Sequence, residues 1–239
     1  MEQIYTIPVN EAFEASEADK GCGCAFCTLY NKLEDNELEL ILGASMMEPD
    51  VRIKTNKEGF CPTHYGMMFT RKNRLGLALM LESHFDDRKP HIFPGGVSEL
   101  FGQSADKAAR GLGELEDSCY VCGRIGYHFE RMIKTAVLLW EQDGDFKKKF
   151  AAQPYFCLPH YKKLIECAKN ELSKKDFKEF YAVASGLEKK YYEKLSEDVS
   201  WFCKKFDYRY ENEPWYDSKD AVERTIKFFS SDLHKEPKK

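Results

Sequence analysis

Apolar residues recur every three to four positions along most of this chain. The period is clearest after Cys122, and a broader apolar stripe follows Cys27 and ends near Gly43. No segment shows the strict alternation of apolar and polar residues that marks a half-buried strand. We therefore predict an all-α fold. The positions that carry the two patterns are Leu29, Tyr30, Leu33, Leu38, Leu40, Ile41 and Leu42, and then Ile125, Phe129, Met132, Ile133, Val137, Leu138 and Trp140.

The same pattern predicts further helices along the chain. Helices are expected to begin near Pro62 and Pro159, since proline is favoured in the first turn of a helix. Residues 86–98 are rich in turn-forming residues and predict a connector, which a helix over 98–116 follows. A charged segment with apolar residues on one side predicts a long helix over 174–206, and a last helix is expected over about 217–233.

Two short motifs occur twice in the sequence. A C-x2-C motif is followed about 33 residues later by a C-x2-H motif, and both recur 95 to 96 residues further along the chain. The likeness extends beyond the motifs, because Phe60 and Phe156 stand directly before the third cysteine of each copy. Two copies indicate a duplicated unit rather than a solenoid, which needs three or more. The eight motif residues are Cys24, Cys27, Cys61, His64, Cys119, Cys122, Cys157 and His160.

The duplication also predicts how the chain is organised. We expect a first helical unit over 1–86, a connector over 87–98 and a second helical unit over 99–172. A helical extension over 173–239, with a long helix and a terminal helix, is expected to pack on the two units. A chain of 239 residues buries a sizeable core, so a metal is not needed merely to stabilise a very small scaffold.

The motif residues are typical ligands of a metal ion. Three thiolates and one imidazole commonly bind structural Zn2+, and two residues between donors allow a tight turn to aim both at one ion. The helix dipole at a helix start also lowers a thiol pKa and favours the thiolate. The residues between the motifs are enough for one helix and a returning linker, so we expect each repeat to close its own site. The prediction is two Zn2+ per chain, one at Cys24, Cys27, Cys61 and His64 and one at Cys119, Cys122, Cys157 and His160.

Ligand types alone leave a second chemistry open. A 4Fe-4S cluster can also take cysteine and histidine, although four thiolates are more usual, and it would make the chain a redox protein or an enzyme of anaerobic metabolism. A closed Cys3His set has no vacant position for a substrate, which argues against catalysis at the metal. The sequence alone does not decide whether the chain is an enzyme. We find no nucleophile with its base and no Gly-rich phosphate loop. A thioredoxin-like pair would need a βαβ setting, which the pattern does not predict.

The remaining cysteines and a group of aromatic residues have simpler interpretations. Cys22 lies two residues before Cys24, but Asp117 takes its place in the second repeat, so we expect it to be a spectator. Cys167 and Cys203 fall in amphipathic helices and are expected in the core. Seven aromatic residues near the C-terminus could line an aromatic pocket, but aromatic residues at helical spacing are more often core, and we expect them there. They are Tyr191, Tyr192, Trp201, Tyr208, Tyr210, Trp215 and Tyr216.

Composition limits the cellular compartment and the classes of partner that we expect. The net charge of -4 comes from interleaved acidic and basic residues, which gives no broad positive field for nucleic acid. The N-terminus lacks the apolar core of a signal peptide and no run of 18 apolar residues occurs, so we expect a cytoplasmic protein away from membranes. In that compartment the nine cysteines stay reduced. A protein or small-molecule partner is expected on residues 174–206, and the pattern does not indicate an oligomeric state.

The duplicated motifs resemble those of an uncharacterised bacterial family, found mainly in anaerobic Gram-positive bacteria. Its members are helical chains of about this length with paired C-x2-C and G-[FL]-C-x2-H elements. The resemblance covers most of the chain, including Phe206-Asp207-Tyr208-Arg209 ahead of Glu213-Pro214. It implies the eight ligands but no established activity. The second repeat departs from the pattern at Tyr155, where the first has Gly59, and this leaves the local turn geometry open.

Overall fold

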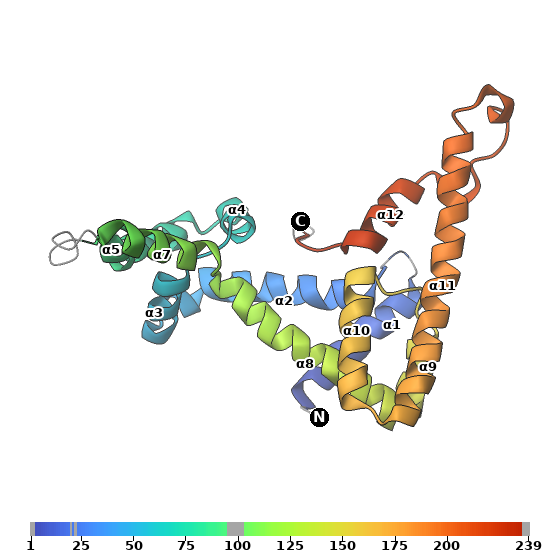
Figure 1. Cartoon of the computed structure of the whole chain (residues 1–239), viewed down its shortest axis with the longest axis horizontal. Helices are drawn as coiled ribbons and strands as arrows, with labels where there is room; N and C mark the ends of the chain where they lie inside the picture. Colours follow the sequence, from blue (N-terminus) through green and yellow to red (C-terminus); the bar gives the residue numbers. More distant parts are fainter. Residues whose placement is uncertain (1–2, 20, 22, 95–102, 236–239) are drawn as a thin grey trace. The chain divides into compact units, whose positions relative to one another are not determined.

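All regular secondary structure in the described part of the chain is helical. The structure, a computed structural model, describes residues 3–19, 21, 23–94 and 103–235, and these form eleven α-helices and no strand (Figure 1). The all-α prediction is confirmed. None of the helices in these ranges combines the length and the apolarity needed to cross a bilayer. The helices are α1 (Thr6–Ala18), α2 (Ala25–Leu42), α3 (Pro49–Glu58), α4 (Pro62–Thr70), α5 (Arg74–Ile92), α7 (Ser104–Glu116), α8 (Tyr120–Gln142), α9 (Gly144–Ala151), α10 (Leu158–Glu171), α11 (Lys174–Lys204) and α12 (Ala221–Ser230).

Each cysteine motif lies at the start of a helix, as predicted. Cys24 and Cys119 directly precede α2 and α8, and the second cysteine of each C-x2-C lies in the first turn. Cys61 and Cys157 are the N-cap residues of α4 and α10, and each helix has its proline in the first turn. Four helix starts therefore present all eight motif residues.

The chain folds into two compact units that do not coincide with the two repeats. Unit one contains the described residues of Met1–Asn31 and Phe129–Lys235, and unit two contains those of Lys32–His128. The unit boundaries fall inside α2 and inside α8. Each of the sequence repeats, 1–86 and 99–172, therefore contributes to both units.

Unit one has a core rich in aromatic side chains. Here α1 packs on α9, and α11 packs on α9, α10 and α12. Phe13 packs edge to face on Phe26 with ring centroids 5.5 Å apart, and Phe150 lies 5.1 Å from both Phe156 and Phe180. Such ring pairs stabilise beyond the area they bury. The fully buried large side chains of this unit are Phe13, Phe26, Leu29, Trp140, Phe146, Phe150, Phe156, Phe180 and Phe228.

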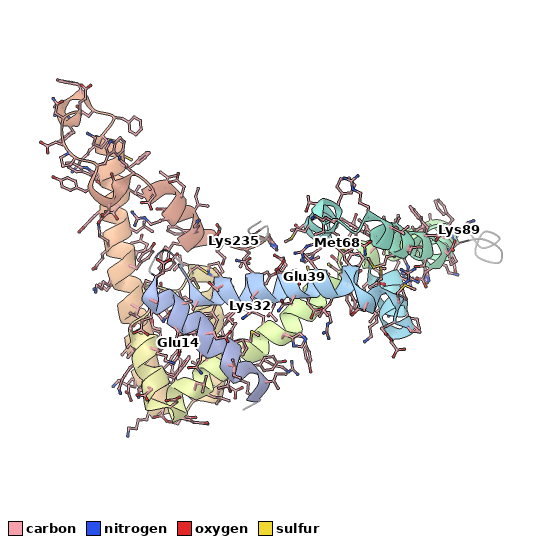
Figure 2. All side chains as sticks on the ribbon, turned by 180° about the vertical axis from the view of Figure 1, so that it is seen from behind. Glu14, Lys32, Glu39, Met68, Lys89 and Lys235 are labelled. Atoms are coloured by element: carbon pink, nitrogen blue, oxygen red, sulfur yellow. The ribbon has the colours of Figure 1, made fainter. Side chains whose placement is uncertain are left out.

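Unit two is built around α5, which packs on α3, α4 and α7. The Ser83 hydroxyl of α5 donates to Asn56 Oδ1 of α3 at 2.7 Å, and Arg52 of α3 donates to the Leu79 carbonyl of α5. Met68, labelled on α4 in Figure 2, is fully buried. The other buried apolar side chains include Leu38, Ile41, Leu42, Leu77 and Met80.

The predicted connector over 87–98 is wrong in its first half. Residues 87–92 continue α5, with Pro90 inside the helix. Here α7 approaches the end of α5 so closely that a Cβ at Gly111 would lie 2.7 Å from the His91 carbonyl oxygen. Helix packing thus outweighs the local cost of the proline. Residues 95–98 of the connector, and residues 98–102 of the helix predicted over 98–116, lie outside the described residues.

The core prediction for the C-terminal aromatic residues is also wrong. None of the seven is buried, and Tyr208 and Tyr216 are 85% and 67% exposed. The 31-residue α11 is much longer than its 14-residue neighbour α10, so its C-terminal end continues past the packed helices (Figure 1). Trp201 packs on Tyr210 and Tyr216 there, whereas Tyr191 stacks on Tyr155. Cys203 is exposed in the same region and Cys167 is half-buried, so neither is a core residue.

Candidate metal centres

The first cluster, site I, joins the start of α2 to the start of α10 within unit one. Its four residues are Cys24, Cys27, Cys157 and His160, and their donor atoms all lie within 4.8 Å of one another. Cys27 Sγ lies 3.6 Å from Cys157 Sγ and 3.5 Å from His160 Nδ1. Each of the four side chains is at most 3% exposed. The His160 ring packs against Phe129, with centroids 5.1 Å apart.

The second cluster, site II, joins the start of α4 to the start of α8 within unit two. It contains Cys61, His64, Cys119 and Cys122, again with all donor atoms within 4.8 Å of one another. His64 Nδ1 lies 3.2 Å from Cys61 Sγ, 3.3 Å from Cys119 Sγ and 3.4 Å from Cys122 Sγ. His64 is fully buried, whereas Cys122 is exposed. Site II is therefore open to solvent on one side.

The predicted grouping of the ligands is wrong, although all eight residues lie in a cluster. Each C-x2-C motif meets the C-x2-H motif of the other repeat, so neither repeat closes a site by itself. The linker after α2 does not return to its own start, because α3 and α4 place Cys61 and His64 beside Cys119. Ligand spacing could not distinguish the two groupings, since both use the same pairs of donors.

The distances between donors match those around a single tetrahedral ion. With Zn–S bonds of about 2.3 Å and Zn–N bonds of about 2.0 Å, tetrahedral donors lie about 3.8 Å apart for two sulfurs and about 3.5 Å apart for sulfur and nitrogen. The sulfur pairs here are 3.6 Å and 3.8 Å apart, and the sulfur–nitrogen distances run from 3.1 Å to 3.7 Å. Both clusters could therefore hold a metal ion.

Backbone contacts position the two motifs of site II. The Ser118 hydroxyl donates to the Glu58 carbonyl at 2.7 Å, and the Tyr120 amide donates to the Gly59 carbonyl at 3.0 Å. Gly59 has φ +59° and ψ -153°, a region that residues with a Cβ avoid. A Cβ there would also lie 3.1 Å from the ring of His84. A glycine is thus required directly before Phe60 and Cys61.

Site I also has a glycine with a positive φ, but this glycine precedes the C-x2-C motif instead of the C-x2-H motif. Gly23, directly before Cys24, has φ +76°, and its carbonyl accepts a 2.7 Å hydrogen bond from the Ser16 hydroxyl. A Cβ on Gly23 would lie 3.0 Å from the hydroxyl of Tyr155. Tyr155 itself stacks on Tyr191 with centroids 3.9 Å apart. The replacement of Gly59 by Tyr155 in the second repeat is therefore accommodated without the strained glycine turn.

A buried carboxylate supports the histidine of site II. When Nδ1 of His64 binds a metal, its Nε2 carries the proton and donates to Glu34 Oε1 at 3.0 Å. Both side chains are almost fully buried. Such a carboxylate fixes the histidine tautomer and strengthens it as a ligand.

The segment after α12 covers the thiolates of site I. The Ser231 hydroxyl lies 3.0 Å from Cys157 Sγ, and the Asp232 amide donates to Cys27 Sγ at 3.4 Å. The Asp232 carbonyl in turn accepts from Asn31 Nδ2 at 2.8 Å. Ser231 adopts φ 72° and ψ 165°, a conformation that costs a non-glycine residue roughly 1–3 kcal/mol. Tertiary contacts therefore hold this serine in position.

The thiols of each cluster differ strongly in acidity. Hydrogen bonds from Cys122, and then from His64, lower the pKa of Cys119 to about 3 against the opposing effect of burial. At site I the hydrogen bonds of Cys24 and Cys27 hold the pKa of Cys157 far below its usual value, while hydrogen bonding to Cys157 and burial raise the pKa of Cys27 to about 12. One thiolate in each cluster disfavours the ionisation of its neighbours. A bound dication would remove this penalty and release the remaining protons.

No sequence pattern indicated the groups that surround the ligands. Glu34 lies in the apolar-periodic stretch of α2, where a glutamate is expected to be on the surface. Ser231 has no counterpart in either repeat. Only the fold brings them beside His64 and Cys157. Cys22, expected to be a spectator, lies outside the described residues.

Comparison with known proteins agrees with the resemblance seen in the sequence. A profile of the family of unknown function DUF6062 matches residues 1–236, so the chain belongs to this family. No curated protein and no solved structure matches the chain. The family membership covers both clusters, and its description gives no activity.

Proposed function

We propose that this member of the DUF6062 family binds two Zn2+ ions, one at each site, as structural centres of a helical scaffold that binds a partner. The observation that carries the proposal is the pair of Cys3His clusters with tetrahedral donor spacing. Each set supplies four protein donors and leaves no coordination position vacant, which is typical of structural zinc, whereas catalytic zinc sites usually keep a position for water.

The position of the sites supports a structural role. Site I joins helix starts about 130 residues apart in the chain, and site II joins helix starts about 60 residues apart. A metal that binds the folded chain but not the unfolded one adds its binding free energy to folding. Each ion would thus stabilise the compact unit that contains its ligands.

The donor spacing favours one ion over a 4Fe-4S cluster. The cysteine ligands of a four-iron cluster bind different iron atoms and lie farther apart than ligands of one ion. In both sites the donors are within 4.8 Å of one another, which suits a single ion better. An iron–sulfur redox protein is therefore the alternative to be tested and not the proposal.

Elemental analysis of anaerobically purified protein tests the proposal. We expect two zinc atoms per chain and a colourless solution. A brown protein that bleaches with dithionite would instead support the iron–sulfur alternative. Protein that is folded and free of any metal would contradict both.

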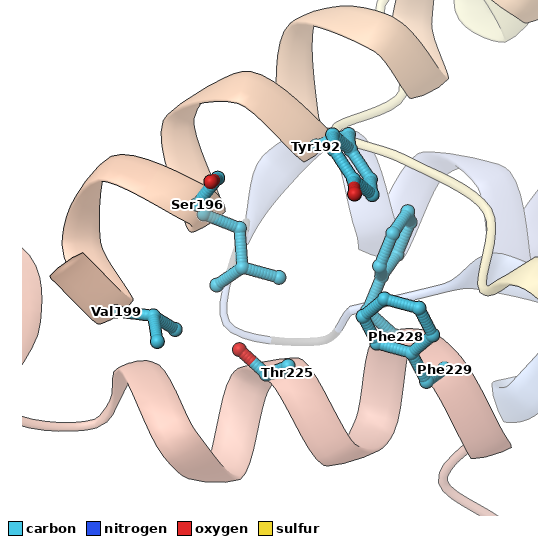
Figure 3. A pocket seen from close by; sticks show the side chains of 7 residues that line it. Tyr192, Ser196, Val199, Thr225, Phe228 and Phe229 are labelled. Carbon is cyan, nitrogen blue, oxygen red and sulfur yellow. The ribbon is translucent and has the colours of Figure 1, made fainter.

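The proposed partner surface lies on α11 and α12, within the predicted segment 174–206 and its neighbour. A pocket of about 180 Å³ opens between these helices, with Tyr192 and Phe229 about half exposed at its edge (Figure 3). Its lining is mostly apolar and suits one apolar side chain of a partner protein. The lining residues are Tyr192, Leu195, Ser196, Val199, Thr225, Phe228 and Phe229.

A charge placed in the pocket tests this part of the proposal. Val199→Asp should abolish the co-purification of a partner that the unchanged protein retains, because the carboxylate would lose its hydration on binding. The variant should still hold two zinc atoms. A partner that binds both proteins equally would move the binding surface elsewhere.

A further inference from the structure

The two sites differ in how well their sulfur atoms are protected. All four ligands of site I are at most 3% exposed, whereas Cys122 of site II is exposed and Cys61 is half-buried. A reagent in solution must reach a sulfur before it can react. Exposure alone therefore favours attack at site II.

Hydrogen bonding to the thiolates differs in the same direction. At site I, Ser231 Oγ and the Asp232 amide contact Cys157 and Cys27 from outside the ligand set. Such donors withdraw electron density from a thiolate and make it a weaker nucleophile. In the described ranges, the hydrogen-bonding contacts of Cys122 Sγ are with its fellow ligands Cys61, His64 and Cys119.

The backbone at Ser231 is a separate sign that this cover is built for site I. Its φ of 72° lies in the left-handed region, which a serine adopts only when surrounding contacts require it. Those contacts are the thiolate of Cys157 and the hydrogen bond that Asn31 donates to the next residue. The strain is thus located at the residue that protects the sulfur.

We propose that Cys122 is a modification site for soft carbon electrophiles such as α,β-unsaturated carbonyl compounds, and that Ser231 and Asp232 shield site I from the same reaction. This inference rests on the proposed zinc binding. The Cys122 thiolate adds to the β-carbon, so a C–S bond forms and the Zn–S bond breaks. The electron pair of the C=C bond moves to the α-carbon, which takes a proton from water. The thioether product is a neutral and poor ligand, and site II loses its ion.

Stepwise alkylation of the zinc-loaded chain with N-ethylmaleimide tests the order of reaction. A Cys22→Ser/Cys203→Ser background removes two other thiols, and its metal content is measured before the reagent is added. Released zinc is followed with a chromogenic chelator, and the labelled cysteine is identified by peptide mass spectrometry. We expect one of two zinc atoms to be released first, with the label on Cys122.

Several outcomes would overturn the inference. Loss of both ions together, or a first label on Cys24, Cys27 or Cys157, would show that site II is not the reactive site. Absence of zinc at the outset would instead contradict the proposed function, so the two failures are distinguishable.

A serine pair tests the shielding. Ser231→Ala should lower the zinc affinity of site I about tenfold and speed the release of the second ion. Ser230→Ala is the matched control, because its hydroxyl bonds to the Ile226 carbonyl inside α12. Equal release from the two variants, with helical content unchanged, would refute the shielding role.

Discussion

The two ring nitrogens of His64 contact different groups, and the group at Nε2 is the carboxylate of Glu34. Nδ1 faces three sulfur atoms while Nε2 faces a buried carboxylate 3.0 Å away. Burial lowers the pKa of His64, but hydrogen bonds with Cys119 and then Glu34 outweigh it and raise the pKa to about 10. The same negative surroundings that favour a proton favour a divalent cation.

Glu34→Gln tests the contribution of this carboxylate. The amide keeps the shape but loses the charge, so site II should bind zinc roughly 10- to 100-fold more weakly. Competition with a chelator of known affinity measures the change. Glu39→Gln, an exposed position on the same helix, is the control and should leave both ions in place. An unchanged affinity in Glu34→Gln would mean that the carboxylate does not tune the site.

Glu188 is a buried carboxylate beside site I, and it predicts a dependence of stability on pH. Its Oε1 accepts from the Phe156 amide at 2.7 Å, while its Oε2 has no hydrogen-bond partner. Burial raises the pKa of Glu188 from 4.5 to about 8. Between these values the folded chain holds a proton that the unfolded chain has released, so stability falls as pH rises from about 4.5 to 8.

Glu188→Gln should remove this dependence. The amide oxygen still accepts from Phe156, and no charge has to be buried at high pH. We expect the variant to match the unchanged protein near pH 4 and to be more stable above pH 8, by an amount on the order of a few kcal/mol. Denaturant unfolding at several pH values measures this. Parallel curves for the two proteins at all pH values would contradict the expected titration.

At the scale of elements, the sequence predicted where helices begin but not which other helices they contact. The positions of Pro62 and Pro159 and the apolar period after Cys122 are local signals, and the structure confirms the helices that they predict. The grouping of ligands depends on the path of the chain after α2, which no local pattern records. The continuation of α5 through Pro90 has the same origin, because it depends on packing against α7.

Alanine substitutions at two glycines, one in a turn and one inside a helix, test whether the backbone at Gly59 requires glycine. Gly59→Ala should destabilise unit two by roughly 1–3 kcal/mol, because its positive φ is strained for alanine and the new Cβ would meet His84. Gly186→Ala, inside α11 with open space around it, should stabilise by about 0.5–1 kcal/mol. Thermal unfolding of zinc-loaded protein measures both. Equal effects of the same sign would show that the backbone at Gly59 is not strained.

At the scale of the whole molecule, the exchange of motifs between repeats ties distant parts of the chain together. Unit one is formed from the first 31 residues and from residues after 128, and site I contains ligands from both parts. The duplication suggested two independent halves. The structure instead places each half of the duplication in both units, so neither repeat alone contains a complete site.

Double substitutions distinguish the two groupings of ligands. Cys24→Ser and Cys157→Ser belong to one site, so each single variant and the double variant should retain one zinc atom per chain. Cys24→Ser combined with Cys61→Ser should retain none, because these residues belong to different sites. Elemental analysis gives the counts. The opposite result for the two double variants would restore the grouping within each repeat.

All four ligands of site II lie between Cys27 and Cys157 in the sequence, and this order matters while the chain is synthesised on the ribosome. The nascent chain presents Cys24, Cys27, Cys61 and His64 before Cys119 has been made. For that interval the motif residues that can bind an ion are those of the first repeat, which do not form one site in the folded protein. An ion bound by those residues would have to leave them before the folded grouping forms, and site I can be completed only after His160 has been made. For the proposed zinc ions, the order of translation would therefore make the time of metal delivery part of how the chain reaches its fold.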